Sequence, residues 1–235
     1  MKQFARVADG RERWNAHDCV PRHRHAAGYV ALVLRGGYEE CGSRGRFRVG
    51  PGDVLLHDAF DAHLDRFGRA GAELLNLAMP GPLPRIAVGC VADPDAIARA
   101  AERDPREAGE MVRAQLRAKS PAPEDWPEVL AAALLDDPGR RLDGWARQEG
   151  LAAETVSRGF GRVFGVTPAA FRAEARARRA FALIVGHDTP LAAIAAATGF
   201  ADQAHMSRAV RRLTGAPPGA WRTSNRFKTA AAPAR

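Results

Sequence analysis

The stretch GFADQAHMSR, residues 199–208, decides the fold of the C-terminal third of the chain. Its glycine allows a tight left-handed turn at the end of a short helix, for which Thr189 and Pro190 form a typical start. Asp202 can cap a second helix that has an apolar inner face and polar, arginine-bearing outer faces. A short helix, a glycine turn and a second helix of this kind predict a helix-turn-helix. The apolar positions of the second helix are Met206, Val210 and Leu213.

The same arrangement occurs earlier in the chain. Residues 142–146 provide an apolar helix face, Gly150 provides the turn, and residues 153–164 provide a second helix. Both units end alike, with FGVTPAAFR at 164–172 and TGAPPGAWR at 214–222. Chance rarely places glycine, proline, aromatic and arginine residues at matching offsets twice. The sequence therefore predicts a duplicated helix-turn-helix.

Residues 139–222 resemble the double helix-turn-helix DNA-binding domain of AraC/XylS-type transcription regulators. The resemblance rests on the 199–208 stretch and on the Gly-x-x-Pro-x-x-aromatic-Arg endings of the two units. It covers about a third of the chain. One departure is visible, because Ala152 and Ala153 stand where the family commonly has a capping serine.

The resemblance implies a division of labour on DNA. Two recognition helices, about 153–164 and 203–213, would be held apart by a connecting helix near 168–186 and enter successive major grooves roughly 34 Å apart. Arginine can make bidentate contacts to guanine and glutamine to adenine, whereas His205 is expected to be structural. The residues placed toward bases are Glu154, Ser157, Arg158, Gln203, Ala204, Ser207 and Arg208. The residues expected to meet phosphates, or to pair with acids, are Arg162, Arg211, Arg212 and Arg222.

The positive charge of the chain is unevenly distributed. The net charge is +8, and residues 137–235 carry +9 while residues 1–136 carry −1. A concentrated basic region is typical of a protein that binds a polyanion, so double-stranded DNA is the expected partner. Compositional bias explains 32 Arg against 3 Lys, but it does not explain why only one part of the chain is basic.

The composition excludes several classes of protein. A chain that is 46% hydrophobic and 26% charged is globular rather than disordered or fibrous. Because no apolar run approaches roughly 18 residues and the first residues lack a signal-peptide pattern, we expect a cytoplasmic protein without a membrane partner. Three cysteines without paired spacing agree with a reducing compartment. No phosphate-binding glycine loop and no nucleophile–base set is apparent, so the chain is not expected to be an enzyme.

The pattern divides the chain into four regions of an α+β two-domain fold. Between residues 10 and 80, short apolar runs separated by Gly and Pro turns predict strands of a sandwich or small barrel. Prolines then interrupt a stretch with helical spacing. The expected organisation is a sensor domain at 1–85, a helical connector at 86–138, an all-α double helix-turn-helix at 139–222 and a disordered tail at 223–235.

Residues 1–85 resemble, more weakly, the cupin sensor domain of many members of this family, which implies a cupin-like β-barrel. The resemblance rests on a histidine pair, a glycine after the next apolar run, the stretch GPGD at 50–53 and a third histidine. Alternate residues of a strand point the same way, so His23 and His25 share a face. His63 from a neighbouring strand can complete a three-imidazole site suited to Zn, Fe, Ni or Cu.

Departures from the cupin pattern leave alternatives open. Tyr29 stands where metal-binding cupins usually carry a carboxylate, and residues 58–60 replace the usual Pro-x-Gly. The histidines could instead serve ligand hydrogen bonds, and His57 could join the metal set or substitute in it. A carboxylate ligand would have to come from elsewhere, such as Asp58, Asp61 or Glu39. A different site could combine His17 and Cys19 with the histidine pair.

Two functions from different classes follow. The first is a transcription regulator whose cupin-like domain senses a small molecule or metal ion and thereby changes its affinity for DNA or its contact with RNA polymerase. In the resembling family activation is the commoner outcome, and a homodimer through the cupin or the helices at 94–136 is an option. The alternative is a cupin metalloenzyme, similar to a dioxygenase or an isomerase, with an appended DNA-binding module.

Overall fold

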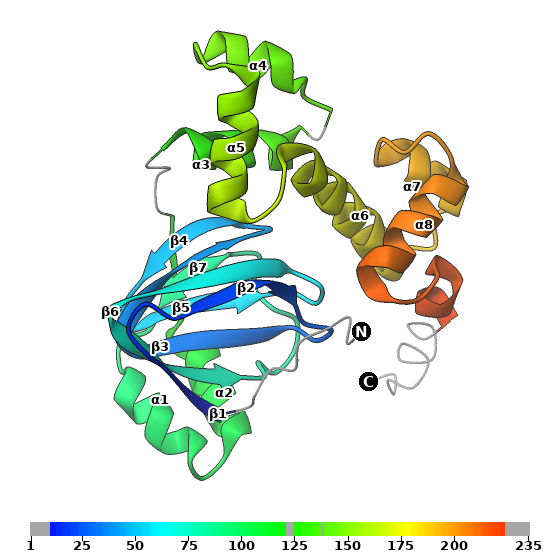
Figure 1. The fold of residues 1–235 in the computed structure, drawn as a ribbon. Coiled ribbons are helices and arrows are strands. Elements are labelled where there is room, and N and C mark those ends of the chain that lie inside the picture. The colour runs from blue at the N-terminus through cyan, green and yellow to red at the C-terminus, as the bar shows by residue number, and fades with distance from the viewer. Residues whose placement is uncertain (1–9, 121–124, 138, 224–235) are drawn as a thin grey trace. The chain divides into compact units, whose positions relative to one another are not determined.

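The computed structural model of the chain describes residues 10–120, 125–137 and 139–223. They belong to two compact units, one comprising the residues up to Val129 with Phe160–Gly165, and the other Leu130–Gly159 with the residues from Val166 onward. The elements are labelled in Figure 1. In the described part of the chain, no helix is long and apolar enough to span a bilayer. The predicted disordered tail lies outside the described residues except for Thr223.

The N-terminal unit is built on one antiparallel sheet of eight strands. The strands are β1 (Gly10–Trp14), β2 (Cys19–Arg24), β3 (Tyr29–Gly42), β4 (Gly45–Val49), β5 (Asp53–His57), β6 (Ala62–Leu77), β7 (Val88–Cys90) and β8 (Arg117–Lys119). Their pairing follows the path β1-β6-β3-β5-β7-β8, with β2 beside β6 and β4 beside β3. This path does not close into a ring, so the structure shows an antiparallel-sheet domain, and the predicted cupin-like barrel stays a prediction.

The central strand β3 gives the sheet two apolar faces, because successive side chains point in opposite directions. Val30 and Leu32 pack with helices α1 (Pro94–Ala101) and α2 (Pro105–Gln115), which cover one face (Figure 1). Ala31 and Val33 pack on the other face with aromatic residues of neighbouring strands. That second face lines the cavity described below.

The stretch predicted as a helical connector, 86–138, contains strand as well as helix. It contributes β7 and β8 to the sheet, with β7 paired to β5, in addition to α1, α2 and α3 (Trp126–Asp136). Residues 86–120 therefore belong to the N-terminal unit by their packing. The predicted boundaries of the four regions stay predictions.

The C-terminal region is helical, as expected. Its helices are α4 (Leu142–Gln148), α5 (Ala153–Phe164), α6 (Pro168–Gly186), α7 (Leu191–Ala197) and α8 (Gln203–Thr214). The turns between α4 and α5 and between α7 and α8 use Gly150 (φ +66°) and Gly199 (φ +72°), a left-handed conformation that side chains other than glycine rarely adopt. Two helix-turn-helix units joined by the long helix α6 are thus present at the predicted positions.

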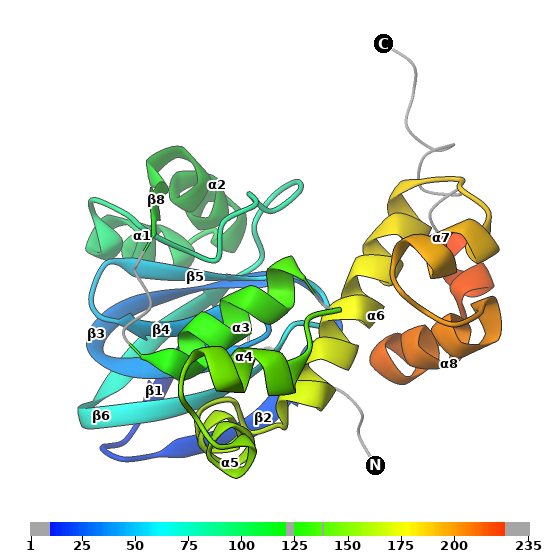
Figure 2. The same ribbon diagram turned by 90° about the horizontal axis from the view of Figure 1, so that it is seen from above.

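Side-chain caps and aromatic contacts fix the ends of these helices. Asp202 Oδ1 accepts a hydrogen bond from the backbone N–H of His205 at 2.6 Å and caps α8. At the start of α7 the sequence prediction was wrong, because Pro190 rather than Thr189 occupies the cap position and no side chain caps that helix. Phe200 is buried in the α7–α8 turn, as predicted, with the Arg176 guanidinium 5.5 Å from its ring centre. Figure 2 shows α7 and α8 beside α6.

Candidate DNA interface and histidine cavity

Helix α8 is amphipathic, with an apolar face and a polar face, because its buried residues recur at helical spacing. Met206, Val210 and Leu213 are buried in the C-terminal unit. The side chains expected at DNA lie on the remaining surface. Ser207 is half-buried, and the exposed residues are Gln203, Ala204, Arg208, Arg211 and Arg212.

Helix α5 repeats this division. Val156, Phe160 and Phe164 are buried, and the two phenylalanine rings stack with their centres 4.5 Å apart. The exposed residues are Glu154, Ser157, Arg158 and Arg162. All the predicted DNA-contacting side chains of α5 and α8 except half-buried Ser207 are therefore exposed, while their assigned contacts with bases and phosphates stay predictions.

Two further residues named from the sequence lie near the helix-turn-helix turns and ends. His205 is half-buried and its ring meets the ring of Phe200 edge-on at 5.2 Å, which agrees with the structural role expected for it. The guanidinium of Arg222 donates a hydrogen bond to the backbone oxygen of Thr189. Arg222 thus has a partner within its own unit, and a phosphate contact would have to coexist with that bond or replace it.

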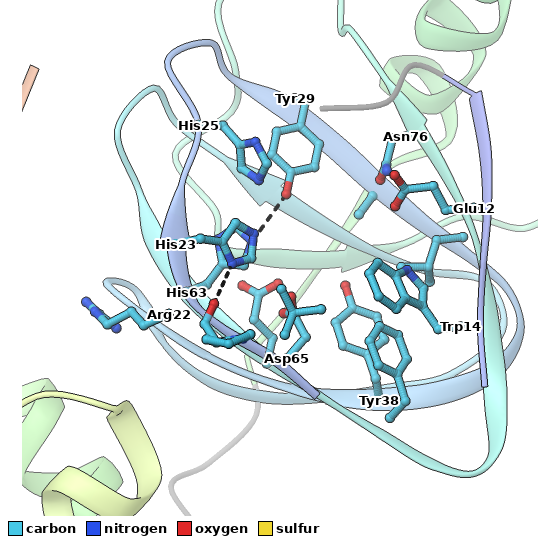
Figure 3. A pocket seen from close by; sticks show the side chains of 16 residues that line it. Glu12, Trp14, Arg22, His23, His25, Tyr29, Tyr38, His63, Asp65 and Asn76 are labelled. Atoms are coloured by element: carbon cyan, nitrogen blue, oxygen red, sulfur yellow. Dashed lines mark hydrogen bonds between the residues drawn. The ribbon is translucent and has the colours of Figure 1, made fainter. Parts of the chain in front are cut away.

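The N-terminal unit contains a cavity of about 430 Å³ on the inner face of the sheet, at one end of which three histidines meet (Figure 3). His23 on β2 lies directly opposite His63 on β6 in the strand register. The ring centres of His23 and His63 are 4.3 Å apart, and those of His25 and His63 are 5.5 Å apart. Each ring offers one nitrogen, and these three nitrogens lie within 4.8 Å of one another. The structure thus brings together the three histidines predicted from the sequence.

Burial favours the neutral imidazole in His23 and His63. It lowers the pKa of His23, although the Nδ1–H donated to the backbone oxygen of Pro21 at 2.9 Å counteracts part of the effect. The pKa of His63 is well below its usual value because of burial and then because of the neighbouring imidazoles. Neutral imidazole is the form that binds metals, and the bond to Pro21 leaves Nε2 of His23 available. These residues therefore fit a transition-metal ion.

Tyr29, at the position where a carboxylate was expected for a metal-binding cupin, is part of this cluster. Its hydroxyl lies 3.4 Å from Nε2 of His63, and its ring stacks on that of His57 with 4.4 Å between centres. Burial raises the pKa of Tyr29, so the phenol stays protonated. Tyr29 contributes a neutral hydroxyl to the cluster, not a negative charge.

Of the three carboxylates suggested by the sequence, Asp61 lies beside the histidines, and Glu39 and Asp58 do not. Glu39 faces arginines, with Arg46 at 2.6 Å. Asp58 is exposed and pairs with Arg44. The sequence reading missed two buried acids, Glu40 on β3 and its cross-strand partner Asp65 on β6. Burial raises the pKa of Glu40 well above its usual range, and it raises that of Asp65 to about 7.

Of the remaining residues named from the sequence as possible metal ligands, two lie beside the histidines and two do not. His57 is buried and lies 4.6 Å from His63 between ring centres, so the structure keeps it beside the cluster. Asp61 is buried and lines a smaller cavity with His57 and His63. His17 and Cys19 are exposed, and among the described residues neither belongs to a group with metal-binding geometry.

Comparison with known proteins assigns the C-terminal region. Residues 145–224 match a protein family described as a helix-turn-helix domain. The HTH-type transcriptional regulator ExsA of Pseudomonas aeruginosa is 32% identical over 78 residues, 33% of this chain and 28% of ExsA. The C-terminal region of this chain is therefore similar to the helix-turn-helix domains of transcription regulators. ExsA is described as a transcriptional regulator, and the alternative of a cupin metalloenzyme gains no support from it.

Similar solved structures include two with low sequence identity to this chain. ToxT of Vibrio cholerae is 8% identical, with coverage of 92% of this chain and 98% of ToxT and a TM-score of 0.43. A probable AraC family transcriptional regulator from Rhodopseudomonas palustris is 21% identical, with coverage of 41% of this chain and 93% of that protein and a TM-score of 0.38. Another ToxT structure contains a bound unsaturated fatty acid. The chain spans only about a quarter of the curated relative ExsA, so the activity of the whole chain is inferred below from its own residues.

Proposed function

We propose that this protein is an AraC-type, sequence-specific DNA-binding transcription regulator whose N-terminal domain binds an effector in the histidine-lined cavity. The observation that carries the proposal is the duplicated helix-turn-helix with polar residues exposed on both second helices. Arg158 on α5 and Gln203 and Arg208 on α8 are exposed, and each has the hydrogen-bonding groups needed for bidentate contact with a base. The excess positive charge of residues 137–235 supports attraction to the phosphate backbone.

The effector in this proposal is a small molecule or a metal ion. The cavity of about 430 Å³ lies within the usual range for small-molecule sites, and it combines aromatic residues with a few polar groups. A metal ion would bind at His23, His25 and His63, where it would supply a positive charge to neutral imidazoles. An effector that binds two conformations with different affinity shifts the population between them, and DNA affinity changes with that shift.

Three partners complete the proposal. Double-stranded DNA in the cytoplasm is the target, RNA polymerase receives the regulatory contact, and a second copy of the chain forms a homodimer. Sedimentation of the full chain at micromolar concentration, with and without DNA, tests the homodimer directly.

Fluorescence anisotropy of labelled DNA tests whether the protein binds DNA in a sequence-specific way. The full chain at moderate salt should bind its own upstream region more tightly than a shuffled duplex of the same length. Loss of one bidentate base contact costs about 1–3 kcal/mol, so Arg208→Ala and Gln203→Ala should each weaken specific binding about 5- to 150-fold. The exposed arginine Arg99 on α1 gives a matched control, and Arg99→Ala should bind as the unmodified chain does. Equal affinity for the native and shuffled duplexes would refute sequence-specific binding.

A further inference from the structure

A second set of metal-binding side chains lies on the other side of His63. Glu40 on β3, His57 at the end of β5 and His63 on β6 each offer one ligand atom, and these atoms lie within 4.8 Å of one another. All three residues are buried, with 6%, 4% and 3% of their surface exposed. We propose that this set, Glu40, His57 and His63, holds a divalent transition-metal ion that links the three strands. The proposal concerns the N-terminal domain alone and does not depend on DNA binding.

The distances between the ligand atoms suit a bound ion better than a direct hydrogen bond between the side chains. Nε2 of His57 lies 3.5 Å from Oε2 of Glu40, which is too long for a good hydrogen bond. Two ligands about 2.1 Å from a tetrahedral ion lie about 3.4 Å apart, which is close to this separation. The rings of His57 and His63 are tilted by 39° with 4.6 Å between their centres. They are not locked in a parallel stack.

Two ring nitrogens of this set are buried and have no hydrogen-bond partner among the described residues. They are Nε2 of His57 and Nδ1 of His63. Leaving a polar atom buried without a partner costs about 1–3 kcal/mol, so such atoms in a folded protein require an explanation. The other nitrogen of His63, Nε2, lies 3.4 Å from the Tyr29 hydroxyl. When Nε2–H donates to that oxygen, the lone pair of Nδ1 is directed away from Tyr29 and is available to an ion.

The size and charge of the surroundings select an ion over an organic ligand. Glu40, His57 and His63 line a small cavity of about 10 Å³, roughly the space of one water-sized sphere. The acid Asp61 lines it too, and Asp65 lies opposite Glu40 in the strand register. These acids favour a cation.

One arginine also lines the small cavity and would oppose a cation there. Asp58 offsets part of this charge, because a guanidinium nitrogen of Arg44 donates to Oδ2 of Asp58 at 3.1 Å. The same nitrogen lies 3.5 Å from the backbone oxygen of Leu56. Two imidazoles and one carboxylate form a donor set that suits Zn²⁺, Fe²⁺ or Co²⁺. Because the ligands come from β3, β5 and β6, a bound ion should stabilise the sheet against unfolding.

Titration of the full chain with Co²⁺ after chelator treatment tests the proposal. The d–d absorption of Co²⁺ reports bound ion and its geometry, and isothermal titration calorimetry gives the affinity. Replacement of a ligand should weaken binding at least 100-fold in Glu40→Gln and in His57→Ala. The matched control is the double variant His23→Ala/His25→Ala, which removes two histidines of the other set and should keep the affinity within about threefold.

Each outcome decides the proposal. Absence of Co²⁺ binding to the unmodified chain overturns it. Retention in Glu40→Gln, or loss in the double variant, also overturns it because the ion would then belong to His23, His25 and His63. Circular dichroism identifies any variant that does not fold. For that case, X-ray absorption of the Co²⁺-loaded unmodified chain gives an independent answer, since two imidazoles with a carboxylate oxygen support the proposal and three imidazoles without one refute it.

Discussion

Replacement of Asp202 should destabilise the C-terminal unit by an amount that follows from one short hydrogen bond. Oδ1 of Asp202 accepts from the backbone N–H of His205 at 2.6 Å, and this N–H lies in the first turn of α8, where the helix has no partner of its own to offer. Loss of a side-chain cap costs about 1 kcal/mol. Loss of the negative charge at the helix N-terminus adds about 0.3–1 kcal/mol. Asp202→Ala should therefore cost about 1.5 kcal/mol, roughly a tenfold change in the unfolding equilibrium.

Differential scanning calorimetry of the full chain measures this effect. For a domain of this size, 1 kcal/mol corresponds to about 4–8 °C in Tm, so Asp202→Ala should lower the transition of the C-terminal unit by about 6–12 °C. Asp202→Asn keeps the acceptor and removes only the charge, so it should lose less than half as much. Equal stability of Asp202→Ala and the unmodified chain, or an asparagine variant as unstable as the alanine variant, would refute the assigned cap.

The remaining predictions concern a glycine inside β3, a glycine in a helix-turn-helix turn and the DNA surface. A side chain at Gly36 would place its Cβ 2.1 Å from the backbone oxygen of Gly71 at φ +69°, so Gly36→Ala should prevent native packing of the sheet, as seen by loss of near-ultraviolet circular dichroism. Gly150 has φ +66° but no atom within 4 Å of such a Cβ, so Gly150→Ala should cost only about 1 kcal/mol in urea unfolding. Arg211→Ala should lower the slope of log affinity against log salt by about 1 on any duplex, because it removes a phosphate contact. Arg208→Ala should reduce discrimination between native and shuffled DNA, because it removes a base contact. The reverse pattern would contradict the assignment of Arg211 to phosphate and Arg208 to bases.

The double helix-turn-helix could be predicted from the sequence because each of its signals is local. A glycine turn and the following cap, such as Gly199 and Asp202, lie within a few residues of each other and act on the same helix end. The predicted start of α7 was wrong by one residue, because the cap position is occupied by Pro190 and not by Thr189. Helix ends are the part of such predictions that depends on fine geometry.

The short outer strands could not be predicted, because pairing across long distances in the sequence creates them. The strand β8 consists of Arg117–Lys119, all exposed and without an apolar alternation, and its partner is β7. Nothing in this short exposed segment distinguishes a strand from a loop, and only the position of the neighbouring strand decides.

The buried acid Glu40 was missed for a different physical reason. Alternation counted from Tyr29 along β3 would turn Glu39 inward, because both positions have the same parity. The pairing of β3 with β6 shifts between Val33 and Arg35, where β3 has one extra residue, and again between Gly36 and Tyr38, where the extra residues belong to β6. A bulge exchanges the two faces for every later residue, so Glu40 faces inward while Glu39 meets arginines outside. Sequence periodicity does not reveal where a strand bulges.

The pairing of β7 with β5 has a practical consequence for dividing the chain. A fragment ending at residue 85 would remove β7 and uncover the backbone N–H and C=O groups of Asp53–Leu55, which now bond to Val88–Cys90. An open edge of that kind recruits other chains and leads to aggregation. A fragment ending after Lys119 would retain this protecting strand together with the helices that cover the apolar face, so it is less prone to such aggregation than the fragment ending at residue 85.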